Sequence, residues 1–250
     1  MNLVKKELKL AVLFIIPTII LTFGVALANT KDTFISAVSN YSLLIGTVLT
    51  LLYLKKENVL ESIKRIFSLP NLFIFILLMI IGLCWTVFSS QLFFSIFPYS
   101  DEEMPYMTVH DILGSVIIAP LSEELVFRFG FVELGKKYGK MTSVTILSVA
   151  VFTIIHFPDI PSACSILGAA ILYVYIYVKT NNIWYSMIAH LINNLISVLA
   201  YHYPIIGNTI LEANSFSDLY NPYFIASSIL MLVCFLLLNK ELGSRNKALF

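Results

Sequence analysis

Residues 71–97 have the sequence NLFIFILLMIIGLCWTVFSSQLFFSIF, which contains no charged side chain. A helix needs about 20 consecutive apolar residues to cross about 30 Å of hydrocarbon, so this stretch is long enough for a transmembrane helix. The whole chain has the same character, because 58% of its 250 residues are hydrophobic and 12% are charged. Soluble domains are roughly 25% charged. The composition therefore excludes a soluble protein and predicts a polytopic membrane protein.

Eight apolar stretches predict an all-α fold, a polytopic membrane helix bundle of about eight transmembrane helices. The predicted spans are residues 9–28, 34–54, 71–97, 111–133, 142–158, 162–178, 183–203 and 223–239. Lysine and arginine gather in alternate connections, and the positive-inside rule places those connections in the cytoplasm. Both termini are therefore predicted to be cytoplasmic, in a multi-pass protein of the cell membrane. We expect one integral membrane domain over residues 1–250, without internal repeats.

The overall charge and the cysteines narrow the functional classes. A formal net charge of +1 gives no basis for nucleic-acid binding, which needs a clustered basic surface. Cys84, Cys164 and Cys234 are an odd number of dispersed cysteines in apolar stretches. This distribution favours core packing over disulfides or a cysteine metal site.

Two carboxylates lie inside the fourth predicted span, in the sequence Pro120-Leu-Ser-Glu123-Glu124-Leu-Val-Phe-Arg128. Charge inside a membrane costs at least a few kcal/mol and marks function or a paired interior group. Proline favours a first helical turn, so we expect Pro120 to begin a helix or to kink one, with the carboxylates near a helix N-terminus. Glu124 and Arg128 are four residues apart and are expected to pair. Glu123 points about 100° away and is expected to be the free carboxylate.

Histidines in two later spans extend this set. His156 lies near the end of the fifth span, and His190 and Asn194 lie four residues apart in the seventh, on one helix face. Together with Glu123 they supply a general base, an imidazole and hydrogen-bond donors for an oxyanion, which are the groups that hydrolysis needs. His110 and His202 lie at predicted membrane borders and are interpreted as interfacial. Asn193 points away from the His190 face and is set aside.

Three motifs carry a resemblance to a known family. Glu-Glu-x-x-x-Arg at 123–128, Phe-x-x-x-His at 152–156 and His-x-x-x-Asn at 190–194 resemble, in order and membrane setting, those of the CPBP intramembrane proteases. This family contains the CAAX prenyl endopeptidases and bacteriocin-processing or abortive-infection proteins. The resemblance covers roughly residues 108–203, the expected catalytic core, with 1–100 and 204–250 as flanking helices. It implies proteolysis within or at the membrane.

The resemblance also implies a role for each residue that matches the motifs. Glu123 would activate water with help from His156, while His190 and Asn194 would stabilise the oxyanion. Glu124 and Arg128 would support the site. Glu123, His156 and His190 are also plausible ligands for zinc, as in a metalloendopeptidase, although their spread over three helices and the lack of a His-Glu-x-x-His helix favour a metal-free mechanism without a cofactor.

The remaining predictions concern the substrate and the other functional classes. Frequent Ile, Phe, Lys and Asn are typical of AT-rich bacteria, so we expect a membrane-associated peptide or protein substrate rather than a prenylated one. Peptide or bacteriocin maturation and self-immunity are the processes that the family suggests. Two alternatives stay open: a catalytically silent membrane scaffold or immunity protein, and an ion-coupled transporter, which would often show inverted repeats.

Overall fold

Every element that the structure describes is a helix, as the composition predicts. The structure is a computed structural model, and it describes residues 44–45, 47–48, 69–97, 107–156, 160–203 and 220–247. Within these ranges, four helices are long and apolar enough to cross a membrane: Asn71–Ile96, Ile160–Thr180, Ile183–His202 and Pro222–Ser244. They match the predicted spans 71–97, 162–178, 183–203 and 223–239. The predicted spans 9–28 and 34–54 lie outside the described residues, apart from four positions of the second.

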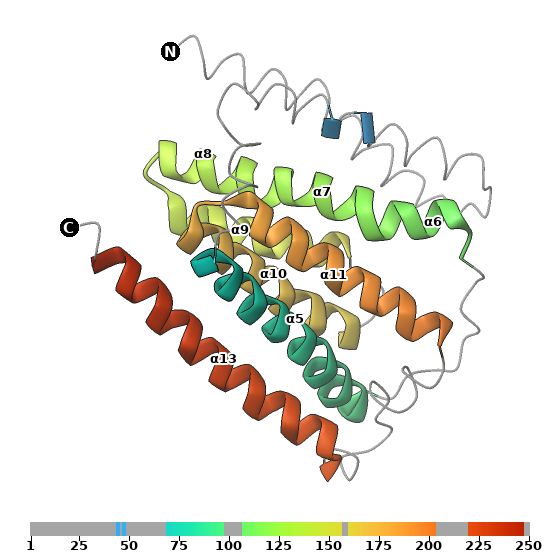
Figure 1. The fold of residues 1–250 in the computed structure, drawn as a ribbon. Coiled ribbons are helices and arrows are strands. Elements are labelled where there is room, and N and C mark those ends of the chain that lie inside the picture. The colour runs from blue at the N-terminus through green and yellow to red at the C-terminus, as the bar shows by residue number, and fades with distance from the viewer. Residues whose placement is uncertain are drawn as a thin grey trace.

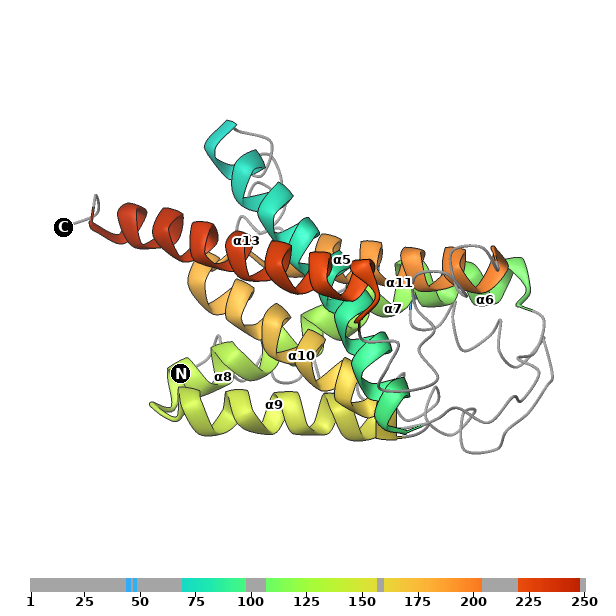
Figure 2. The same ribbon diagram turned by 90° about the horizontal axis from the view of Figure 1, so that it is seen from below.

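The helices pack as a bundle, and two of them, Leu69–Ile96 and Ile160–Thr180, lie at its centre (Figure 1). The long helices are α5 (Leu69–Ile96), α9 (Met141–Ile155), α10 (Ile160–Thr180), α11 (Ile183–His202) and α13 (Pro222–Lys247). α5 contacts α10, α11 and α13, while α10 also contacts α9 and α11. Figure 2 shows α13 on the side of the bundle opposite α9. Much of the apolar surface of α13 is exposed, including Ile229, Leu232 and Leu236.

The segment that carries the two glutamates is one continuous helical run of changing type. It consists of α6 (Val109–Leu113), the π-helix η3 (Gly114–Ile118), α7 (Ala119–Glu123), the π-helix η4 (Glu124–Gly130) and α8 (Phe131–Lys137). Pro120 lies in the first turn of α7, as predicted. The helical path nevertheless continues from η3, because the Ala119 N–H donates to the Gly114 carbonyl. The expectation of a helix N-terminus beside the glutamates is therefore wrong, since the preceding turns are already hydrogen-bonded.

The fifth predicted span is shorter than expected. Residues 142–158 were expected to cross the membrane, but α9 ends at Ile155 and has 15 residues, which span about 22 Å at 1.5 Å per residue. His156 follows the helix with φ −107° and ψ 20°. The sequence favours an end at this place, because Pro158 follows and helices usually end before the residue that precedes a proline. His156 is thus a residue of the helix end rather than of a helix interior.

A close approach between α5 and α10 fixes the centre of the bundle. The Trp85 indole lies against Gly168, where an added Cβ would stand 1.9 Å from Trp85 Cζ2. The Trp85 Nε1–H donates to the Ser165 carbonyl over 2.8 Å. Only glycine leaves room for the indole at position 168. This contact sets the distance between α5 and α10, and α10 packs beside the candidate site.

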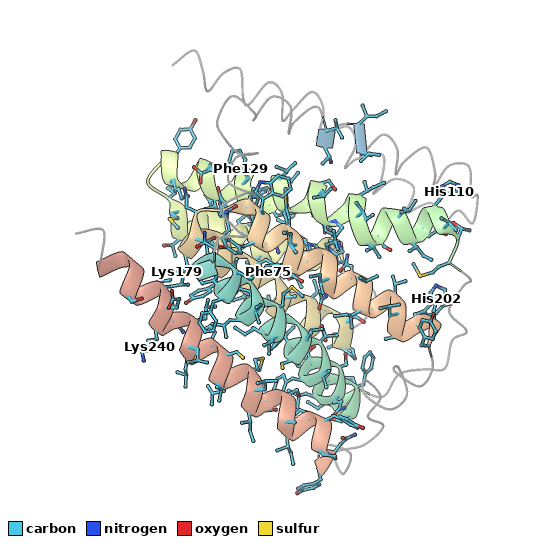
Figure 3. The ribbon with its side chains drawn as sticks, in the orientation of Figure 1. Phe75, His110, Phe129, Lys179, His202 and Lys240 are labelled. Atoms are coloured by element: carbon cyan, nitrogen blue, oxygen red, sulfur yellow. The ribbon has the colours of Figure 1, made fainter. Side chains whose placement is uncertain are left out.

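The two ends of the bundle carry different basic residues, as Figure 3 shows. Lys179 and Lys240 lie towards one end, and His110 and His202 lie towards the other. His110 and His202 are both exposed, in line with the interfacial interpretation. The orientation of the chain in the membrane stays a prediction.

Candidate active site

Glu124 and Arg128 form a buried ion pair, which the four-residue spacing predicts. Arg128 Nε lies 3.3 Å from Glu124 Oε2, and neither side chain is exposed. The guanidinium lies over the ring of Phe152, 4.2 Å from its centroid, and 5.4 Å from the centroid of the Tyr173 ring. A buried charge is tolerated only when it is paired, so each of these two groups depends on the other.

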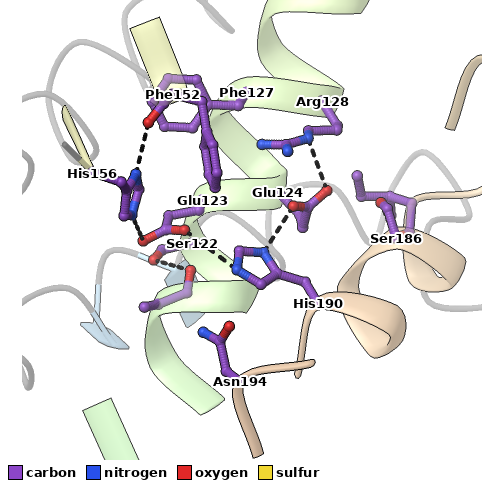
Figure 4. A network of polar contacts seen from close by, with 12 residues as sticks. Ser122, Glu123, Glu124, Phe127, Arg128, Phe152, His156, Ser186, His190 and Asn194 are labelled. Carbon is purple, nitrogen blue, oxygen red and sulfur yellow. Dashed lines mark hydrogen bonds and ion pairs between the residues drawn. The ribbon is translucent and has the colours of Figure 1, made fainter. Parts of the chain in front are cut away.

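Glu123 lies between the two imidazoles, in the centre of the network in Figure 4. Its Oε1 is 3.4 Å from His156 Nε2, and its Oε2 is 3.7 Å from His190 Nε2. The Glu123 side chain is 19% exposed, whereas that of Glu124 is fully buried. Three helical segments, α7, the end of α9 and α11, therefore bring together the residues that the three motifs contribute. Of the two adjacent carboxylates, Glu123 is therefore the accessible one.

Hydrogen bonds to the other ring nitrogen orient both imidazoles. His190 Nδ1–H donates to Glu124 Oε1 over 3.0 Å, and His156 Nδ1–H donates to the Phe152 carbonyl over 2.8 Å. Each bond fixes the ring plane and leaves Nε2 directed at Glu123. When one ring nitrogen of a histidine is held by such a hydrogen bond, the other nitrogen is the one that can take part in catalysis. Glu124 thus links two functions, because it neutralises Arg128 and orients His190.

Asn194 lies beside His190 on α11, with its amide group towards Glu123 and His190 (Figure 4). Its Nδ2 donates to the Ser115 carbonyl of η3 over 2.8 Å. A side-chain amide has two N–H donors, so this bond uses one and leaves the other. The neighbouring Asn193 points instead towards α5, where its Oδ1 accepts a hydrogen bond from Thr86, as the helical spacing predicts.

Two aromatic residues at the site received no role from the sequence. The Phe152 ring contacts the His156 ring at 4.5 Å and the His190 ring at 5.9 Å between centroids. The Tyr173 ring stacks on His190, with centroids 4.9 Å apart and planes at 22°. Phe152 was visible as part of the Phe-x-x-x-His motif. Tyr173 was not, because it is one of several tyrosines on α10 and belongs to no motif.

The three residues that were considered as possible zinc ligands form no metal-binding group among the described residues. Glu123, His156 and His190 have suitable donor atoms, and both imidazoles carry the second hydrogen bond that is common for metal-bound histidine. Zinc requires nitrogen and oxygen ligands at about 2.0–2.2 Å from one point. Among the residues that the structure describes, no group of three or more His, Cys, Asp or Glu side chains could hold a metal ion.

Comparison with known proteins identifies a family for the segment that contains this site. Residues 105–196 match the family model described as type II CAAX prenyl endopeptidase Rce1-like. This range includes all seven defined residues of the three motifs. No curated protein and no solved structure matches the chain. The matched description names an endopeptidase, and it supports neither a role in bacteriocin immunity nor metal dependence.

Proposed function

We propose that this chain hydrolyses a peptide bond of a membrane-associated peptide or protein. Its residues 105–196 match the Rce1-like type II CAAX prenyl endopeptidase family, and this family suggests an intramembrane protease. The observation that carries this proposal is the difference between the two adjacent carboxylates. Glu124 is buried and paired with Arg128, while Glu123 is partly exposed and faces two imidazole Nε2 atoms. Glu123 is thus available to accept a proton.

In the proposed reaction, Glu123 is the general base. Its carboxylate takes a proton from a water molecule as the water oxygen attacks the scissile carbonyl carbon. The tetrahedral intermediate collapses when the carbon–nitrogen bond breaks, and the proton passes from Glu123 to the leaving amine nitrogen. His156, held by the Phe152 carbonyl, keeps its Nε2 beside Glu123 Oε1 and positions the carboxylate and the water.

His190 and Asn194 are proposed to stabilise the oxyanion. His190 Nδ1–H is used by Glu124, so Nε2 can donate to an oxyanion only when the ring is an imidazolium. The bond to Glu124 holds the His190 ring with its Nε2 on the Glu123 side of the site. The second N–H of Asn194 provides another donor.

We propose a substrate without a prenyl group, as the composition of the chain favours. The test uses purified protein in liposomes with two peptides of the same sequence, one prenylated at a C-terminal CAAX motif and one not, and with unmodified membrane-spanning peptides. We expect cleavage of an unmodified membrane peptide. Cleavage of the prenylated peptide alone would contradict the proposed substrate class but support proteolysis. No cleavage in any arm would contradict the proposed function.

Asn194→Ala is expected to lower kcat by about 10²–10³-fold, because one preorganised oxyanion donor is lost. His190→Ala is expected to have an effect of the same order. Asn193→Ala is the matched control, since Asn193 precedes Asn194 on the same helix but bonds to Thr86 outside the site. Steady-state kinetics of the reconstituted variants measure the difference. Equal losses for Asn193→Ala and Asn194→Ala would contradict the role of Asn194.

Removal of metal is expected to leave turnover unchanged, since the proposed mechanism relies on Glu123 without a metal. The measurement is kcat before and after extensive chelation, together with elemental analysis of the active protein. Stoichiometric zinc in the active protein, with activity that is lost to chelator and restored by zinc, would contradict the metal-free mechanism. Glu123, His156 and His190 would then be its first candidate ligands.

A further inference from the structure

Pro120 lies inside a continuous helical run, where a proline removes one backbone hydrogen bond. Proline has no N–H, so a carbonyl of the preceding turn loses its donor. In an α-helix that carbonyl would be four residues earlier, at Val116. In a π-helix it is five residues earlier, at Ser115. The register of η3 (Gly114–Ile118) decides between them.

The register next to Pro120 is that of the π-helix. The Ala119 N–H donates to the Gly114 carbonyl, five residues earlier, rather than to Ser115. The next donor in this register would be the N–H of residue 120, which proline lacks. Both helical donors that could reach the Ser115 carbonyl, from residues 119 and 120, are therefore used elsewhere or missing.

The Ser115 carbonyl is the group that holds Asn194. Asn194 Nδ2 donates to it over 2.8 Å, from the adjacent helix α11. A carbonyl without a helical donor is a strong acceptor for such a bond, because a polar group that is removed from water without a partner is costly. The bond fixes the orientation of the Asn194 amide group, which lies on the side of Glu123 and His190 (Figure 4).

We infer that Pro120 is a positioning residue for the oxyanion site, because it keeps the Ser115 carbonyl open for Asn194. This inference rests on the proposed function for its effect on catalysis. Positions 120 and 194 are in addition energetically coupled through this one carbonyl, and the coupling does not depend on whether the protein cleaves a peptide.

The test of the structural part is a cycle of Pro120→Ala, Asn194→Ala and the double variant, followed by thermal melting. In the wild-type background, Asn194→Ala leaves the Ser115 carbonyl without a donor and is expected to lower the melting temperature by about 2–4 °C. In the Pro120→Ala background, the new N–H can bond to that carbonyl, so the same change is expected to cost clearly less. Equal shifts in both backgrounds would overturn the inference, whether or not the wild-type protein cleaves a peptide.

The test of the catalytic part uses the same variants in a cleavage assay. Pro120→Ala is expected to fold at least as well as the wild type and to lower kcat by about 10-fold or more with KM nearly unchanged. The double variant is expected to match Asn194→Ala, because both changes act on one donor. Pro161→Ala is the control, since Pro161 is also buried but lies in the first turn of α10, where the N–H has no helical partner. Wild-type kcat in Pro120→Ala, or additive losses in the double variant, would overturn the catalytic part.

Discussion

Glu123→Gln is expected to lower kcat by about 10²–10⁴-fold, the usual contribution of a general base. Glutamine keeps the shape of the side chain and can still contact His156 and His190, but it cannot accept a proton from water. Because Glu123 is partly exposed and is not the partner of Arg128, the fold is expected to tolerate the change. The measurement is peptide turnover by reconstituted protein, with thermal melting of the same samples.

Glu133→Gln is the matched control for this change. Glu133 lies ten residues further along the same helical run, is 40% exposed and pairs with Lys136 over 2.6 Å. Its loss is expected to leave kcat unchanged, because Glu133 lies outside the site. A Glu123→Gln protein that melts like the wild type and retains its turnover would remove Glu123 from the mechanism.

Arg128→Met is expected to lower the free energy of unfolding by about 3–5 kcal/mol, the cost of breaking a buried ion pair at one end. The change leaves the carboxylate of Glu124 without its cation in a position with no exposure. It also removes the contact of the guanidinium with the Phe152 ring. Since Glu124 also orients His190, activity is expected to fall together with stability. Chemical unfolding of the purified protein in detergent measures the effect.

Two further variants separate the charge from the loss of packing. Glu124→Gln combined with Arg128→Met removes both charges and is expected to recover part of the stability, since the neutral amide of glutamine is less costly to bury. Lys136→Met breaks the exposed pair with Glu133 and is expected to change stability by only about 0–1 kcal/mol. If Arg128→Met unfolds like the wild type, the structural role of this ion pair is wrong.

Charge and spacing made much of the site predictable. Glu124 and Arg128 pair because a four-residue spacing brings two groups to one helix face and a buried charge needs a partner. His190 and Asn194 share a face of α11 for the same reason, while Asn193 turns to Thr86. Length and hydropathy predicted the four long apolar helices within the described part of the chain.

Backbone register and ring contacts were not predictable in this way. Apolar periodicity cannot separate an α-helix from a short π-helix, so η3 and η4 were not expected. The expected helix N-terminus at the glutamates was wrong because Pro120 is accommodated by this change of register rather than by a break. Tyr173 was missed because its place beside His190 depends on how α10 packs against α11, which no local pattern encodes.

The most direct test of proteolysis by this site is mass spectrometry of peptide termini. Membranes and medium are compared from cells that carry either the wild type or Glu123→Gln at matched expression. We predict new termini, from membrane-associated peptides or proteins, that occur only with the wild type. Identical termini in both samples, with an unchanged phenotype, would contradict the proposal and favour a membrane scaffold or immunity protein without catalytic activity.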